Sequence, residues 1–212
     1  MIDPRIENLA RDVLILSRNL LLVNLRFLDV AIHQLNLRAM NEIPTMAVDG
    51  ENLYYNPYYI LNRYKAKREN VVRDILHAIC HCLFHHPFVN KLVHQGCWDL
   101  ACDIAVENAI NDLGLSAVTN QRGASQLKLL KSLENDLKLI TAEKLYRYYL
   151  DQNLDDEDLI RLRQDFYADD HSMWYQPLGE KSSGQAKEKA GGEKSVSQMS
   201  CITESLNTEQ SI

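Results

Sequence analysis

An uninterrupted run without glycine or proline, from Lys65 to His86, most constrains how this chain can fold. Pro87 follows it, and proline typically ends a helix. Apolar residues in the run recur at three- and four-residue steps and share one side of a helix: Val72, Ile75, Leu76, Ile79 and Leu83. The sequence therefore predicts one helix over about 65–86, buried on one side and free to carry a site on the other.

Histidines gather on the side of this helix that lacks apolar residues. His77 and His81 are separated by one helical turn, or about 40° around the axis. Two imidazoles at this spacing can converge on one metal ion at ~2.0–2.1 Å. His85 shares the same side and is a lesser candidate, and His94 is expected in a loop. The alternative is a solvated helix face that is rich in histidine.

An acidic helix face follows about twenty residues later. Gly96 and Gly114 flank a predicted helix from Trp98 to Leu113, which carries Asp99, Asp103 and Glu107 at four-residue steps. A helix with two histidines followed by a helix with carboxylates is the arrangement of a metal site with two imidazoles and one carboxylate. An ordinary solvated acidic face remains the alternative.

The rest of the chain predicts an α+β fold that is mainly helical, with a small hairpin or sheet. Asp-Gly between two short runs rich in strand-forming residues is a strong hairpin signal. The expected elements are helices over 4–40, a hairpin over 45–55 around Asp49-Gly50, helices over 125–150 with a break near Thr141, and an acidic helix over 155–168. We expect one domain over 1–178 and a disordered tail or linker over 179–212, which is rich in Lys, Glu, Ser and Gly.

Composition and charge exclude several classes of function. With 46% apolar and 25% charged residues, the chain is typical of a globular protein. Its net charge of −6 resides in residues 151–170, so no basic surface for nucleic acid is expected. Charges also interrupt the leucine-rich stretch over 13–30, which argues against a membrane span. An odd number of scattered cysteines and no signal-peptide pattern favour a cytoplasmic protein with reduced thiols.

The segment His77-Ala78-Ile79-Cys80-His81 resembles the zincin metallopeptidase motif H-E-x-x-H, with alanine in place of glutamate. The wider match runs from Leu9 to Leu113. It includes the hairpin that ends in Asn56-Pro57, the helix end His86-Pro87-Phe88, and the pattern Trp98-x-x-Ala101-x-Asp103. On these residues the chain resembles a bacterial zincin-like metallopeptidase domain that precedes a von Willebrand factor A-like domain.

The resemblance implies a zinc ion and a peptide or protein substrate. His77 and His81 match the two metal-binding histidines, and Asp103 matches the acid of the downstream helix. We therefore expect Asp103 as the third ligand, with His86 as the alternative. The resemblance also implies an A-like domain and a chaperone-type ATPase as partners. Charge and hydropathy, as argued above, predict neither a nucleic acid nor a membrane as a partner.

Ala78 departs from the family pattern at the position of the catalytic base. The glutamate beside the first histidine accepts the proton of the metal-bound water, and alanine cannot. We expect zinc binding with little or no peptide hydrolysis, either in an engineered inactive form or in a natural pseudo-enzyme. Asp74 and Glu107 are candidates for a substitute base, although neither occupies the expected position. The alternatives are a non-catalytic metal- or peptide-binding module and a helical interaction protein without metal.

Another histidine lies beside two acids near the end of the predicted domain. Asp169-Asp170-His171, close to Trp174, could supply a late acid or metal ligand. Since no periodic pattern connects these residues to the predicted site, an exposed loop is the expectation.

Overall fold

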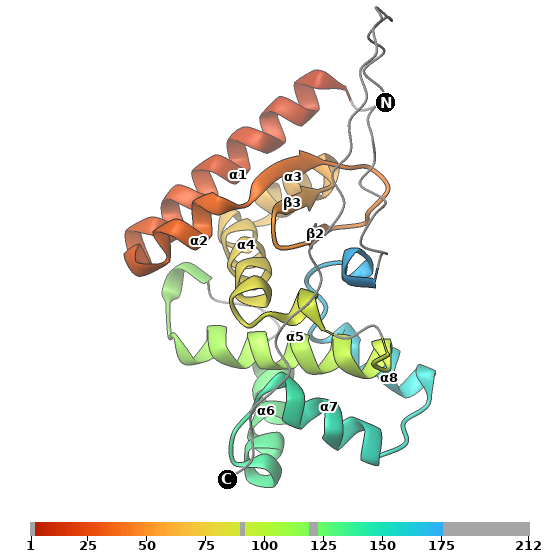
Figure 1. Cartoon of the computed structure of the whole chain (residues 1–212). Helices are drawn as coiled ribbons and strands as arrows, with labels where there is room; N and C mark the ends of the chain where they lie inside the picture. Colours follow the sequence, from red (N-terminus) through yellow and green to blue (C-terminus); the bar gives the residue numbers. More distant parts are fainter. Residues whose placement is uncertain (1–2, 90–91, 119–122, 176–212) are drawn as a thin grey trace, which may run out of the picture. The chain divides into compact units, whose positions relative to one another are not determined.

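The computed structural model describes residues 3–89, 92–118 and 123–175 (Figure 1). Eight α-helices lie in these ranges: α1 (Pro4–Asn24), α2 (Asp29–Gln34), α3 (Pro57–Ala66), α4 (Arg68–Leu83), α5 (Gln95–Asp112), α6 (Gly123–Leu137), α7 (Ala142–Asp151) and α8 (Asp156–Gln164). The strands are β1 (Asn36–Ala39), β2 (Met46–Val48) and β3 (Asn52–Tyr55). The predicted α+β, mainly helical fold is confirmed, whereas the predicted tail over 179–212 lies outside the described residues.

The sheet has the strand order β1-β3-β2 and contains the predicted hairpin. β2 and β3 pair in an antiparallel manner, and the Asp49 carboxylate accepts hydrogen bonds from the backbone N–H groups of Glu51 (2.8 Å) and Asn52 (2.7 Å) at the turn. β1 runs parallel to β3 and occupies residues that we expected to be helical. This expectation was wrong, because strand pairing depends on a distant partner rather than on local periodicity.

Gly50 allows the hairpin turn to approach a neighbouring ring closely. Its φ angle is +91°, in the left-handed region, and a Cβ atom built there would overlap the ring of Phe88.

We expect Gly50→Ala to destabilise the fold by about 1–3 kcal/mol, since strained backbone of this kind has that cost. The midpoint of thermal unfolding should fall by several degrees. Gly114→Ala is the matched control, because Gly114 also has a positive φ of 61° but no heavy atom within 4 Å of the added Cβ. Equal melting temperatures for the two variants would show that contact with Phe88 adds nothing.

α1, α3 and α4 pack together and bury the first apolar core with the sheet (Figure 1). α1 begins as its sequence suggests, with Asp3 capping the helix and Pro4 in its first position. The helix predicted over 65–86 is confirmed over its larger part as α4. α3 was not predicted, although Asn56 caps it with its side chain and Pro57 begins it.

α5 packs against α7 and α8 and forms the second apolar core. The predicted break near Thr141 is confirmed. The Thr141 hydroxyl accepts a hydrogen bond from the N–H of Lys144 at 3.4 Å and caps α7. α4 belongs to the first core and α5 mainly to the second, and the two helices contact each other. Their polar faces therefore meet inside the protein.

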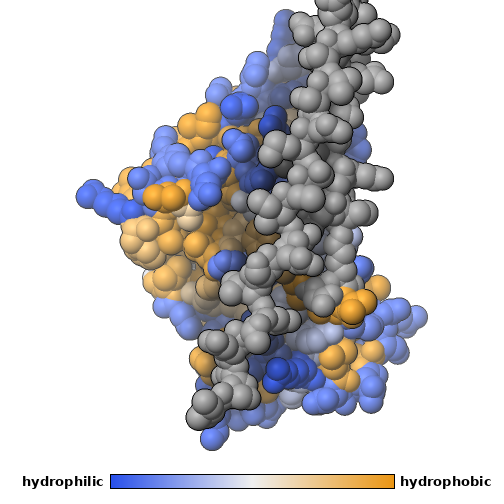
Figure 2. All heavy atoms as spheres, in the orientation of Figure 1, coloured by the Kyte–Doolittle hydropathy of each residue, from blue (hydrophilic) through white to orange (hydrophobic). Residues whose placement is uncertain are grey.

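The surface beside α1 and α2 is partly apolar. Figure 2 shows hydrophobic surface gathered near α2, and exposed apolar residues of this part of the chain include Val23, Phe27 and Val30. None of the helices in the described ranges has both the length and the apolar character needed to span a membrane.

Candidate metal centre

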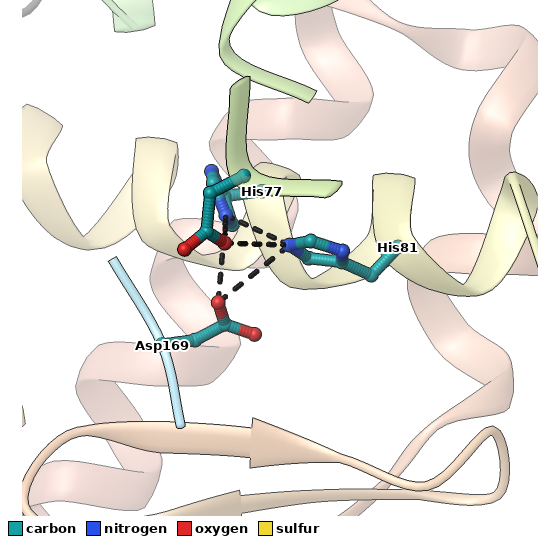
Figure 3. Close-up of side chains that lie close together, drawn as sticks. His77, His81 and Asp169 are labelled. Carbon is teal, nitrogen blue, oxygen red and sulfur yellow. Dashed lines mark hydrogen bonds and ion pairs between the residues drawn. The ribbon is translucent and has the colours of Figure 1, made fainter. Parts of the chain in front are cut away.

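Four buried side chains converge where α4 meets α5. His77 and His81 come from α4, Asp103 from α5, and Asp169 from the segment that follows α8. Figure 3 shows both imidazoles and the Asp169 carboxylate directed toward one point, with the Asp169 backbone between α4 and the sheet. One nitrogen or oxygen atom from each of the four residues lies within 4.8 Å of the others. All four residues are 0% exposed.

The spacing of these atoms fits a tetrahedral metal ion. The Nε2 atoms of His77 and His81 are 2.9 Å apart, and Asp103 Oδ1 lies 3.4 and 3.5 Å from them. Asp169 Oδ1 lies 3.4 and 3.6 Å from the same two nitrogens. An ion with four bonds of ~2.0–2.1 Å places its ligand atoms ~3.3–3.4 Å apart in a regular tetrahedron. The distances between the histidines and the carboxylates are therefore close to those of a tetrahedral metal site, while the two Nε2 atoms lie closer together than in a regular tetrahedron.

The other ring nitrogen of each histidine has a partner of its own. His77 Nδ1 lies 2.8 Å from Glu107 Oε1, and His81 Nδ1 lies 2.9 Å from His86 Nδ1. Histidines that bind metals typically donate their second N–H in this way, which fixes the ring and leaves Nε2 for the metal. Both Nε2 atoms and both Oδ1 atoms face the same point, so only a proton or a cation there prevents their repulsion.

One atom of the cluster has no hydrogen-bond partner within the described chain. Asp169 Oδ2 is buried, yet no donor reaches it. A buried carboxylate oxygen is costly without compensation, and this one belongs to the carboxylate whose Oδ1 atom faces the two histidines.

A second layer of charges surrounds the cluster. Glu107 also binds Arg73, while Arg163 donates from Nε to Asp103 Oδ2 at 3.1 Å. His171 Nε2 lies 3.1 Å from both Asp103 Oδ1 and Asp169 Oδ1. These contacts hold the carboxylates in position and partly balance their charge.

The pKa values keep most of the cluster in the state that a metal requires. Burial alone would raise the pKa of Asp103, but His171 and the other histidines hold it well below its usual range. Burial lowers the pKa of His81 to about 4, so its ring is neutral. Burial also opposes a charge on His77, yet hydrogen bonds to Asp103, Asp169 and Glu107 raise its pKa well above the usual value. A metal ion would compete with the proton of His77.

The structure brings His77, His81 and Asp103 together, as the sequence predicts. His86 is buried behind His81, against the ring nitrogen that points away from the cluster. Ala78 is 0% exposed and packs within the first apolar core.

The remaining candidates from the sequence lie elsewhere. His85 is exposed at the end of α4, and His94 caps α5 by accepting a hydrogen bond from the N–H of Cys97 at 3.3 Å. Asp74 pairs with Arg63 and accepts a hydrogen bond from Tyr59.

The expected exposed loop over Asp169-Asp170-His171 was wrong in its main point. Asp169 is 0% exposed, His171 3% and Trp174 5%, and Asp169 belongs to the cluster. The acidic helix face is also buried rather than solvated. The two acids, the histidine and the tryptophan close together in the sequence were the feature that could have indicated a site. Because they lie far from α4 along the chain, the sequence alone did not connect them with His77 and His81.

Comparison with known proteins agrees with this geometry. A family model with the description “Putative metallopeptidase domain” matches residues 17–210. The comparisons with curated proteins and with solved structures gave no match.

Proposed function

The chain belongs to this metallopeptidase-domain family, and on that basis we propose that it binds one zinc ion through His77, His81 and Asp103. The observation that carries the proposal is the tetrahedral spacing of the imidazole and carboxylate atoms. Two imidazoles with carboxylate oxygens form a typical zinc site, whereas calcium and magnesium prefer six or more oxygen ligands.

Zinc bound at this site would polarise a carbonyl group and lower the pKa of a bound water toward ~7. The protein residues supply orientation: Glu107 and His86 hold the two rings, and Arg163 holds Asp103. At the position where the family has its glutamate, this chain supplies no proton acceptor, since the side chain of Ala78 is a methyl group. Glu107 is engaged by His77 and Arg73, and Asp74 by Arg63.

We therefore infer a zinc protein of the metallopeptidase type with little or no peptidase activity. General acid–base assistance typically contributes 10²–10⁴-fold to the rate, and the residue that provides it is replaced. Burial of the whole cluster favours the second candidate, a non-catalytic metal- or peptide-binding module in an assembly with an A-like domain and an ATPase. The four cysteines of the described ranges are free thiols, which supports the proposed cytoplasmic location.

Elemental analysis of the full chain tests the proposal. Protein purified without chelators should contain about one zinc per chain, as expected for a single site of this type. Hydrolysis of casein and of short peptides should stay at the background level of chelator-treated protein. A zinc content near zero would refute the metal site, and turnover that chelators abolish would refute the inactivity.

A further inference from the structure

The fourth side chain of the cluster comes from a segment that is separate from the two site helices. Asp169 lies after α8, 66 positions beyond Asp103 in the sequence, on an irregular segment that continues into a short 3-10 helix over Ser172–Tyr175. Its Oδ1 atom is as close to the two histidine nitrogens as that of Asp103. The geometry therefore gives the two carboxylates equivalent positions.

The segment is fixed to the edge of the sheet next to the site. β2 has only one neighbour within the sheet, so one of its sides can accept hydrogen bonds from another chain segment. Asp170 donates its backbone N–H to the carbonyl oxygen of Met46 at 2.6 Å, and Trp174 donates its indole N–H to that of Val48 at 3.1 Å. An extended peptide that bound to this edge would use the same two acceptors.

Side-chain packing also holds the segment over the cluster. The rings of His171 and Trp174 stack with centroids 3.6 Å apart and an angle of 13° between their planes. His171 contacts both carboxylates of the cluster, and its other nitrogen faces Asp99 at 3.1 Å. Asp169, His171 and Trp174 thus form one buried unit that covers the side of the site next to β2.

We propose that residues 169–174 are a built-in ligand of the metal centre, in which Asp169 occupies the fourth coordination position and the edge of β2 anchors the segment. The inference rests on the proposed zinc site. Zinc sites with four protein ligands are closed, whereas catalytic sites keep one position for water or substrate. An external carboxylate or peptide reaches the metal only after this segment is displaced.

Cobalt substitution with acetohydroxamate as the probe tests this inference without an activity assay. Co²⁺ reports its coordination in the visible spectrum, and the hydroxamate binds metals that have an accessible position. The spectrum of the natural protein should change little with the probe. Asp169→Ala should still bind Co²⁺ through three residues, and its apparent affinity for acetohydroxamate should rise at least tenfold.

Two further variants separate coordination from general loosening of the segment. Asp165→Ala removes an exposed carboxylate that lies before the segment, and should respond to the probe like the natural protein. Trp174→Phe keeps a ring but removes the hydrogen bond to Val48, and should give intermediate affinity. Circular dichroism should show that each variant is folded.

The outcomes distinguish this inference from the proposed zinc site. If Co²⁺ binds and acetohydroxamate changes the spectra of the natural protein and of Asp169→Ala equally, the built-in ligand is refuted while the metal site stands. If the natural protein binds neither zinc nor Co²⁺, both proposals are refuted. An effect of Asp165→Ala as large as that of Asp169→Ala would also overturn the assignment of Asp169.

Discussion

Replacing His77 and His81 together with alanine is expected to reduce the zinc content from about one ion per chain to none, because the two imidazoles are the nitrogen ligands of the proposed site. Both Nε2 atoms face the centre of the cluster, and their second nitrogens are held by Glu107 and His86. Asp103 and Asp169 would remain, but two carboxylates alone do not complete a tetrahedral zinc site.

Loss of the metal should also lower thermal stability. A ligand at 1,000 times its dissociation constant stabilises the folded state by about 4 kcal/mol. For a domain of this size, the midpoint of unfolding should therefore fall by roughly 10 °C. Chelation should produce this shift in the natural protein and no shift in the double variant, which calorimetry can measure directly.

His33→Ala is the matched control for the histidine variants. His33 lies in α2, its side chain is 50% exposed, and it pairs with the exposed Asp29 one turn earlier in the same helix. Its zinc content and chelator-induced shift should equal those of the natural protein. A double variant that still shifted by roughly 10 °C on chelation would place the metal elsewhere.

The central part of the site could be predicted because its signals are local. The helical period places His77 and His81 on one side of α4 and the apolar residues on the other, and the same period places Asp103 on one face of α5. The polar faces of α4 and α5 are buried because the two helices pack against each other there, and the clustered side chains lie at that contact. Spacing within each helix was therefore sufficient to find the two histidines and the acidic face of α5, and the family resemblance selected Asp103 from that face.

Asp169 and β1 could not be predicted for a different reason. Each acquires its position from a partner far away in the sequence: Asp169 from α4, and β1 from β3. β1 has alternating exposed and half-buried residues, which is a weak apolar signal. Asp169 lies in an acidic stretch that resembles a solvated surface by composition alone.

Ala78 shows a further limit of helical geometry. The position after His77 lies about 100° around the helix, so the sequence cannot tell whether it faces the open side of the metal or the core. In the structure Ala78 is buried among apolar residues. The motif identifies which residue is replaced, whereas only the fold shows the surroundings of its side chain.

Glu107 is expected to affect both metal binding and folding, because it joins two buried groups. One carboxylate oxygen lies 2.8 Å from His77 Nδ1, and the other accepts a hydrogen bond from Arg73, which is 6% exposed. Loss of such an outer partner typically weakens metal affinity 10–100-fold. Removal of one member of a buried ion pair typically costs 3–5 kcal/mol.

Two substitutions at Glu107 should separate these effects. Glu107→Gln retains an oxygen that can accept from His77 Nδ1, so zinc affinity should fall by about tenfold, the lower end of that range. Glu107→Ala leaves both His77 and Arg73 without this partner, so affinity should fall toward 100-fold. The metal-free Ala variant should lose about 3–5 kcal/mol of unfolding free energy, measured in urea with a chelator present. Glu143→Gln, at an exposed position in α7, is the control and should change neither quantity. Unchanged zinc affinity in both Glu107 variants would show that this carboxylate does not position His77 for the metal. A residue that orients the imidazole of His77 should lower zinc affinity even in a variant that keeps its fold.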